Sequence, residues 1–198
     1  MTSNSVIPVF PLQRVVFPDS VLKLQIFEQR YLDMIARQLA NDDVTNRGFG
    51  ITLIKKGNEA GIPATPFEYG TYVDVVDFDQ RDNGLLLITC IGKQRFRINS
   101  QTIMDDRLIT ANISWLADIE PRPMEETQSE LVGLLAELSQ HPQVDILDLP
   151  KKWHELGFVM ERLAEYMPVS EHQKQAFLET QSIDTRIAML YQMLDWLR

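Results

Sequence analysis

Cysteine is almost absent from this chain: Cys90 is the single one in 198 residues. An intramolecular disulfide is therefore excluded, as is usual for proteins of the reducing cytoplasm. No apolar run approaches the roughly 18 residues that a membrane-spanning helix needs. The N-terminus, MTSNSVIPVF, lacks the basic start and the long apolar stretch of a signal peptide. We therefore predict a cytoplasmic protein that does not enter a membrane.

Positive charge is scarce as well. The 19 Lys and Arg residues are outnumbered by 28 Asp and Glu residues, which gives a net charge of −9. Nucleic-acid binders usually have a basic face, because phosphate contacts supply much of their affinity. The nearest approach to such a face is Lys93, Arg95 and Arg97, which alternate along one expected strand. Three charges on an acidic background make nucleic acid an unfavoured partner.

Sequence motifs for nucleotides and metal ions are missing. The chain has neither the Gly-x-x-x-x-Gly-Lys-Ser/Thr loop that cradles phosphates nor the Gly-x-Gly-x-x-Gly of dinucleotide-binding folds. In the segment DFDQRDNG, Arg81 and Asp82 stand where a calcium loop needs an oxygen ligand and a glycine. No two of the histidines, at positions 141, 154 and 172, are four residues apart. We therefore expect no metal and no cofactor.

The candidate nucleophiles have structural explanations. Cys90 lies in the middle of the apolar stretch LLITCIG, and free cysteine is among the most often buried residues. Ser170 and Lys174 have the spacing of a Ser-Lys dyad on a helix. However, Ser170 also forms a capping box with Gln173, which is typical of the start of a helix. We therefore predict no catalytic residue and no enzyme activity.

Two kinds of periodicity divide the chain. Up to about residue 116, alternating apolar segments predict strands, joined by turn signals such as Asn83-Gly84. Prolines at positions 8, 11 and 18 interrupt the first apolar segment, Val6–Phe17, and predict an edge strand or an irregular one. Beyond residue 123 the apolar spacing is helical. We predict an α+β protein with a β-rich region at 1–119 and a helical region at 120–198.

One stretch, LKLQIFEQRYLDMIARQLA, changes period without a glycine or a proline. Leu22–Ile26 alternates as a half-buried strand does, whereas from Tyr31 onward the apolar residues lie on one face of a helix. Phe27, Glu28 and Arg30 stand at the change. We expect Glu28 and Arg30 to hold this corner as an ion pair or a cap, with Phe27 and Tyr31 buried beneath them. The alternative is a polar anchor in a binding groove.

Six segments in order carry a family resemblance: IPVFPLQRVVFP (7–18), LKLQIFEQRY (22–31), FGI (49–51), YGTYVDV (69–75), GKQRFRI (92–98) and MPVSEHQKQAFLE (167–179). Together they resemble the N-terminal substrate-recognition (LON) domain of the Lon protease family, in the form of a short stand-alone protein. The sequence departs from the family at Asp19, where relatives commonly have glycine, and at Lys23 and Gln29, where they commonly have proline. The ATPase and Ser-Lys peptidase modules of full-length Lon have no counterpart in these residues.

This resemblance implies a fold and a function. The fold is a β-rich PUA-like pseudo-barrel with one helix, followed by a C-terminal α-helical bundle. The function is a non-catalytic module that binds unfolded or apolar peptide segments of client proteins. Such a module would act as an adaptor in proteolysis or quality control, alongside a protease or a chaperone. Other PUA-like domains suggest RNA binding as an alternative, which the net charge disfavours, and a hydrolase with a non-standard site is a third hypothesis.

We expect a client to bind the β-rich region, Val6–Leu116. Its candidate site residues are Phe10 and Phe17, which would give contact area, and Glu28 and Arg30 at the corner. The apolar stripes of the helical tail are expected to be used up in packing its own bundle. Phe96 is expected to be buried.

Overall fold

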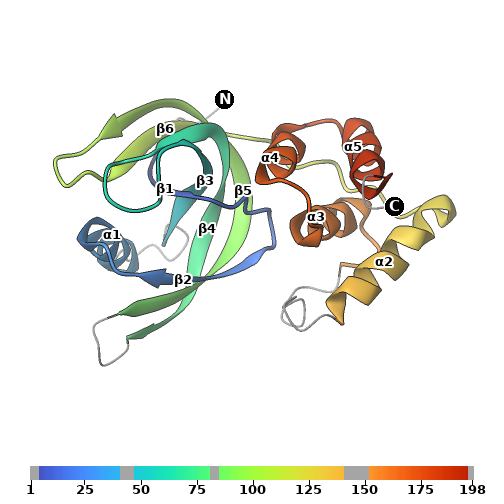
Figure 1. Cartoon of the computed structure of the whole chain (residues 1–198), viewed down its shortest axis with the longest axis horizontal. Helices are drawn as coiled ribbons and strands as arrows, with labels where there is room; N and C mark the ends of the chain where they lie inside the picture. Colours follow the sequence, from blue (N-terminus) through green and yellow to red (C-terminus); the bar gives the residue numbers. More distant parts are fainter. Residues whose placement is uncertain (1–4, 41–46, 81–84, 141–151, 196–198) are drawn as a thin grey trace. The chain divides into compact units, whose positions relative to one another are not determined.

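The protein consists of two compact parts (Figure 1). The computed structural model describes residues 5–40, 47–80, 85–140 and 152–195. Its chain divides into Met1–Ala117 and Asp118–Arg198, called here the β unit and the helical unit. A six-stranded sheet with one helix makes up the first unit and helices make up the second, which confirms the predicted α+β class.

The sheet of the β unit closes on itself. Its elements are β1 (Ser5–Leu12), β2 (Val21–Ile26), α1 (Gln29–Leu39), β3 (Gly48–Lys56), β4 (Thr65–Gln80), β5 (Leu86–Ile103) and β6 (Ile109–Trp115). The strand order is β2-β5-β4-β3-β1-β6, and β6 also pairs with the second half of β5. The strands β1, β3, β4, β5 and β6 therefore form a closed ring of pairings. β2 is added to the ring along the first half of β5.

Of the two predictions for the first strand, edge or irregular, the edge position was wrong, because β1 lies inside the ring. It pairs with β6 over Ser5–Val9 and with β3 over Val9–Leu12. Pro8 therefore has a partner only on β6 and Pro11 only on β3. Each proline can direct its missing N–H away from its one neighbour, so the ladders tolerate both. Among the described strands, the edge position belongs to β2, which pairs with β5 alone.

Two apolar clusters lie on opposite faces of β1, β3 and β4, as the alternation of strand side chains requires. One cluster contains Phe96 and is bounded by β5 and β6. The other lies beneath α1 and β2, and Tyr31, Met34 and Ile35 of the helix enter it. The sequence reasoning had expected Tyr31 and Phe96 to be buried, and this is confirmed.

The ring of Phe96 occupies a slot that two glycines provide. A Cβ atom on Gly50 would lie 2.6 Å from Phe96 Cζ, and one on Gly70 would lie 2.8 Å from the same atom. Both distances are shorter than a real carbon–carbon contact allows. Three of the segments that carry the family resemblance therefore meet at one packing site, because a bulky ring requires two neighbouring strands without side chains.

The helical unit is built around α3. Its elements are the 3₁₀ turn η2 (Glu126–Gln128), α2 (Ser129–Ser139), α3 (Leu156–Tyr166), α4 (Glu171–Glu179) and α5 (Ile183–Asp195). α3 packs against α2, α4 and α5 and is buried along most of its length. The capping box predicted for Ser170 and Gln173 is present at the start of α4. Among the described helices, none is both long enough and apolar enough to cross a membrane.

One buried arginine, Arg186, ties α5 to α3, and a second, Arg162, is paired within α3. The Arg186 Nη1 atom lies 2.7 Å from Glu161 Oε1, and Arg162 Nη1 lies 2.9 Å from Glu165 Oε2. Arg186 also donates to the carbonyl oxygens of Thr180 and Leu178. Both guanidinium groups are fully buried, so their partners offset a large desolvation cost. The hairpin signal at Asn83-Gly84 lies outside the described residues.

Candidate functional site

The corner between β2 and α1 is held by Glu28 and Arg30. Arg30 is 6% exposed, and its Nη2 atom lies 2.9 Å from Glu28 Oε2. The same guanidinium donates to the Arg107 carbonyl oxygen at 3.3 Å and lies over the Tyr31 ring. Glu28 also accepts a hydrogen bond from the Gly61 amide. These contacts join three distant segments, which favours a structural role for the pair. Glu28 occupies the N-cap position, but its side chain makes no capping hydrogen bond.

The predicted burial of Phe27 was wrong: its side chain is 65% exposed. Ile26, one residue earlier, is 1% exposed, and it is the last of the inward-pointing side chains of β2. Because successive strand side chains point to opposite faces, Phe27 must then point outward. Phe10 of β1 fills the space beneath the corner instead. Its ring stacks on Tyr31 with the centroids 3.8 Å apart.

Phe17 does not provide contact area, contrary to our expectation, because it is fully buried. The turn that contains it is folded onto the sheet. The Phe17 amide donates to Ser20 Oγ, and the preceding carbonyl, of Val16, accepts a hydrogen bond from Thr71 Oγ1 at 2.6 Å. Phe10 is also buried, at 7% exposure, but it lines a surface groove.

This groove runs along the edge strand β2 and is called here the β2 groove. It has a volume of about 210 Å³, enough for a large side chain. Phe10 and Leu12 come from β1, residues 23–26 come from β2, and Phe27, Glu28, Tyr31 and Glu59 complete the lining. Glu59 accepts a hydrogen bond from the Gln13 amide, so the loop that carries it is fixed in place. A second exposed apolar side chain, Ile62 at 80%, follows directly after Gly61, which bonds to Glu28.

Burial dominates the chemistry of Tyr31 in this groove. It raises the pKa of the phenol to about 12, against the opposing effect of the Arg30 charge, and Glu28 and Glu59 raise it further. The phenol is therefore protonated at neutral pH. It offers a hydroxyl donor in a hollow that Phe10 and Leu12 line on one side and Glu28 and Glu59 line on another.

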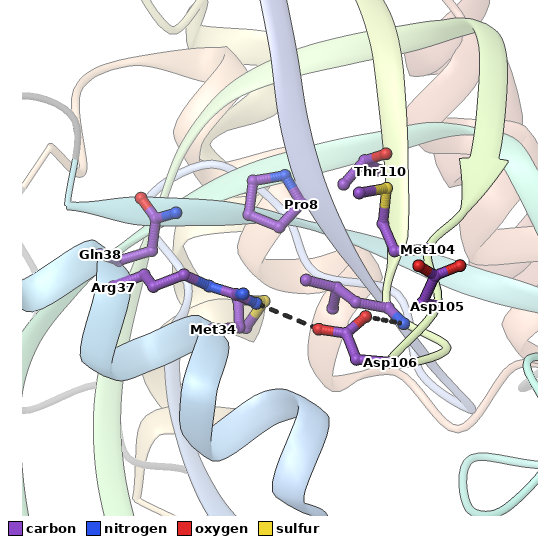
Figure 2. Close-up of a pocket in the computed structure, with 9 residues that line it drawn as sticks. Pro8, Met34, Arg37, Gln38, Met104, Asp105, Asp106 and Thr110 are labelled. Atoms are coloured by element: carbon purple, nitrogen blue, oxygen red, sulfur yellow. Dashed lines mark hydrogen bonds and ion pairs between the residues drawn. The ribbon is translucent and has the colours of Figure 1, made fainter.

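A second hollow lies at the other end of α1 (Figure 2). It has a volume of about 400 Å³ and is lined by Met34 from the helix, Pro8 from β1, and Met104 and Thr110 near the β5–β6 turn. The Arg37 guanidinium reaches across it to Asp106 at 3.4 Å. Met104 is 48% exposed. Flexible methionines suit a surface that accommodates varied apolar partners.

Neither hollow is lined by a cysteine or a histidine. Among the described residues, no three His, Cys, Asp or Glu side chains gather into a metal site. Cys90 is fully buried, and burial followed by the charge of Asp74 raises the pKa of its thiol to about 12. Because the thiolate is the nucleophilic form, this thiol is inert at neutral pH. The two hollows are suited to contact with apolar groups.

Comparison with known proteins identifies the family. Residues 6–195 match the family described as the ATP-dependent protease La (LON) substrate-binding domain. The chain belongs to this family. Its fold is that of the Lon N-terminal domain protein from Xanthomonas campestris, with a TM-score of 0.76, 28% identity and coverage of 97% of this chain and 98% of that one. The N-terminal domain of the Mycobacterium avium complex Lon protease also shares the fold, with a TM-score of 0.63, 15% identity and coverage of 96% and 97%.

One relative is much longer than this chain. The Lon protease of Buchnera aphidicola is 23% identical over 197 residues, which is 96% of this chain. The match covers 25% of the Buchnera protein, so the chain spans about a quarter of this relative's length.

The structure also explains one departure from the family. Asp19 stands where LON domains commonly have glycine, and its φ of 60° lies in the left-handed region that favours glycine. The Asp19 amide donates to the Gly92 carbonyl oxygen, and the Gly92 amide donates to the Ser20 carbonyl oxygen. The turn is thus fixed on β5 by paired backbone hydrogen bonds. Aspartate is among the residues that tolerate this conformation best.

Proposed function

We propose that this chain is a non-catalytic binding module for unfolded polypeptides, and that extended apolar segments of its clients bind at the β2 groove. The observation that carries the proposal is the exposed Phe27 at the end of an edge strand, beside a hollow that Phe10, Leu12, Leu24 and Ile26 help to line. Membership of a family described as a substrate-binding domain supports it.

The binding mode follows from the edge position of β2. A strand with one neighbour can pair with an added peptide through its main chain, and alternate side chains of the peptide then point toward the protein. One such side chain would enter the hollow between Phe10 and Leu12. Phe27 would cover the peptide from the exposed side. The Glu28–Arg30 pair then has a positioning role, because it fixes the backbone that directly follows Phe27.

The expected affinity is modest. The hollow holds roughly one side chain, and a flexible peptide loses conformational freedom when it binds, so we expect a dissociation constant in the micromolar range. The β unit carries 12 basic and 13 acidic residues, so its net charge is close to zero. Client binding should therefore depend little on salt, whereas RNA binding would weaken steeply as salt is added.

The role we propose is that of a cytoplasmic adaptor in proteolysis or protein quality control. The description of the family names an ATP-dependent protease. We do not assign that activity to this chain. The chain would hold an unfolded client while a protease or a chaperone acts on it. We expect no catalytic contribution from it, because its one thiol is buried and no three of its described His, Cys, Asp or Glu side chains gather into a metal site.

A titration with a matched pair of variants tests the proposal. A fluorescently labelled, reduced and alkylated unfolded protein is titrated with the full chain, and binding is followed by anisotropy. Phe27→Glu places a charge at the β2 groove, and Met104→Glu places the same charge at the hollow of Figure 2. We expect the first variant to weaken binding at least about tenfold, as loss of a central aromatic contact does. The second should leave it within about twofold.

Three outcomes would count against the proposal. Equal binding by the Phe27→Glu variant and the native chain would show that the β2 groove is not the site. Loss confined to the Met104→Glu variant would move the site to the other end of α1. Binding that disappears between 50 and 500 mM salt (roughly a tenfold range chosen to separate phosphate-type binding from apolar binding) would indicate an electrostatic interaction instead.

A further inference from the structure

The helical unit contains an apolar groove of its own, called here the α2–α5 groove. Its volume is about 480 Å³. Leu131, Leu134 and Leu138 of α2 line one side, Tyr191 and Leu194 of α5 line the other, and Met167 lies between them in the chain at the end of α3. The apolar stripes of this unit are therefore not used up within its own bundle, contrary to the expectation from sequence.

The spacing of these residues suits a helical ligand. Leu131, Leu134 and Leu138 follow one another at three and four residues, so they form a ridge along one face of α2. Tyr191 and Leu194 are three residues apart on α5. A groove between two helices with such apolar rows is typical of sites that accept a third, amphipathic helix through its i, i+3 and i+7 side chains.

The net charge of the helical unit indicates which charges an incoming partner helix should carry. From residue 118 to 198 the chain has 15 acidic and seven basic residues, so nearly the whole net charge of −9 lies in the helical unit. Four of its described cations form ion pairs within the unit: Arg122, Arg162, Lys174 and Arg186.

The groove itself is bordered by carboxylates. Glu130 lies at one end of the α2 ridge and Asp195 lies beside Leu194 on α5. Glu130 and Tyr191 both line the groove, and burial followed by the Glu130 charge raises the pKa of the Tyr191 phenol. Basic side chains at the margin of an incoming helix would meet these acids, which favours a cationic partner over an acidic one.

We propose that the α2–α5 groove docks a basic amphipathic helix of a partner protein, with an apolar stripe on the leucine ridge and Lys or Arg beside Glu130 and Asp195. This site is separate from the β2 groove, so the chain has two binding surfaces of different chemistry. One takes extended apolar clients with little help from charge. The other takes a folded, cationic element, which gives an adaptor the means to hold a client and a partner at once.

Designed peptides test this surface directly. The probe is a labelled 18-residue helical peptide with leucines at i, i+3, i+7 and i+10 and lysines along both margins of that stripe. A second peptide has glutamates in place of the lysines, and a third has the first composition in scrambled order. We expect the native full chain to bind the basic helix with micromolar affinity, and the other two at least tenfold more weakly.

Variants of the chain locate the site. Leu134→Glu, at a half-buried position of the ridge, should weaken binding of the basic helical peptide at least tenfold. Glu130→Lys should weaken binding of the basic peptide at least threefold and strengthen binding of the acidic peptide. Its matched control is Glu137→Lys, on the same helix but outside the groove, which should change neither affinity by more than about twofold, because surface charges act weakly at a distance.

The remaining outcomes separate this proposal from its alternatives. Unchanged affinity in both Leu134→Glu and Glu130→Lys, or equal binding of the scrambled peptide, would overturn it. A native chain that dimerises by sedimentation, and becomes monomeric in Leu134→Glu, would show that a second copy occupies the groove instead. The Phe27→Glu variant should bind the basic helix normally. If the Phe27→Glu variant lost binding of both the basic helical peptide and the unfolded client, the assignment of two separate surfaces would be overturned.

Discussion

Substituting alanine for Gly50 tests how tightly the ring of strands closes around Phe96. The added Cβ would lie 2.6 Å from Phe96 Cζ and 2.9 Å from Ile7 Cδ1, and all its closest neighbours are side-chain atoms. Alanine in place of a strand glycine normally gains about 0.5–1 kcal/mol. Overpacking of this kind costs about 1–3 kcal/mol. We therefore expect Gly50→Ala to lower the free energy of unfolding of the β unit by about 1–2 kcal/mol.

A second substitution should relieve this cost. Phe96→Leu shortens the side chain that the new methyl group meets, at a cost of its own of about 1–2 kcal/mol, less than the 3–5 kcal/mol of truncation to alanine. In the Phe96→Leu background we expect Gly50→Ala to cost less than about 0.5 kcal/mol, a coupling of about 1 kcal/mol. Gly70→Ala should not be rescued, because its Cβ would meet the backbone carbonyl oxygen of Ile51.

Urea denaturation followed by tryptophan fluorescence measures these values. Trp115 packs edge-on against Tyr72 in the β unit, so replacing Trp153 and Trp196 by phenylalanine leaves a reporter of that unit alone. Gly133→Ala in α2 is the control, since a Cβ there meets nothing within 4 Å. Additive effects of Gly50→Ala and Phe96→Leu, to within about 0.5 kcal/mol, would refute the slot described here.

Four further outcomes are expected. Phe27→Ala should cost less than about 1 kcal/mol of stability, because only about a third of the ring is buried and full burial of a phenylalanine contributes roughly 1.5–3 kcal/mol; a larger shift in urea midpoint would contradict its placement. Arg186→Met should cost about 3–5 kcal/mol in the helical unit, because it leaves Glu161 without its buried partner; far-ultraviolet circular dichroism measures it. Stability of the β unit should fall as pH rises from about 9 to 12, because the unfolded Cys90 thiol ionises near its ordinary pKa of 9.0 while the folded thiol stays protonated up to about 12. Cys90→Ala should flatten that decline, and an unchanged slope would remove Cys90 as its cause. Phosphate release from ATP and cleavage of unfolded casein should stay at the level of a blank, and activity abolished by a single substitution would contradict the non-catalytic proposal.

The sequence predicted where helices and strands lie better than it predicted which strands pair with one another. The change of period at Leu22–Ile26 located β2 and α1, and the capping box located the start of α4, because both signals are local. The position of β1 was missed, since prolines usually indicate an edge. Whether a strand has one neighbour or two depends on how it is offset against its partners, and that is a property of the closed sheet.

The sequence predicted which residues lie at the corner better than it predicted their exposure, and client binding there stays a prediction. Glu28 and Phe10 do line the β2 groove, but Phe17 is buried and Phe27 takes the exposed position. Continuing the alternation of β2 past Ile26 would have predicted that Phe27 points outward. The expectation that an aromatic residue at a corner is buried led to the opposite prediction. The hollow at Met104 had no signal in the sequence, because it arises where the β5–β6 turn meets α1.

Hydrogen exchange of the full chain, with and without a saturating unfolded client, tests the central proposal most directly. An added strand would bond to the outer edge of β2, so we expect amide exchange to slow across Val21–Phe27 and at the adjoining corner. Amides of α2 to α5 should exchange at the same rate in both samples. Protection confined to the helical unit, or to the turn around Met104, would contradict the account.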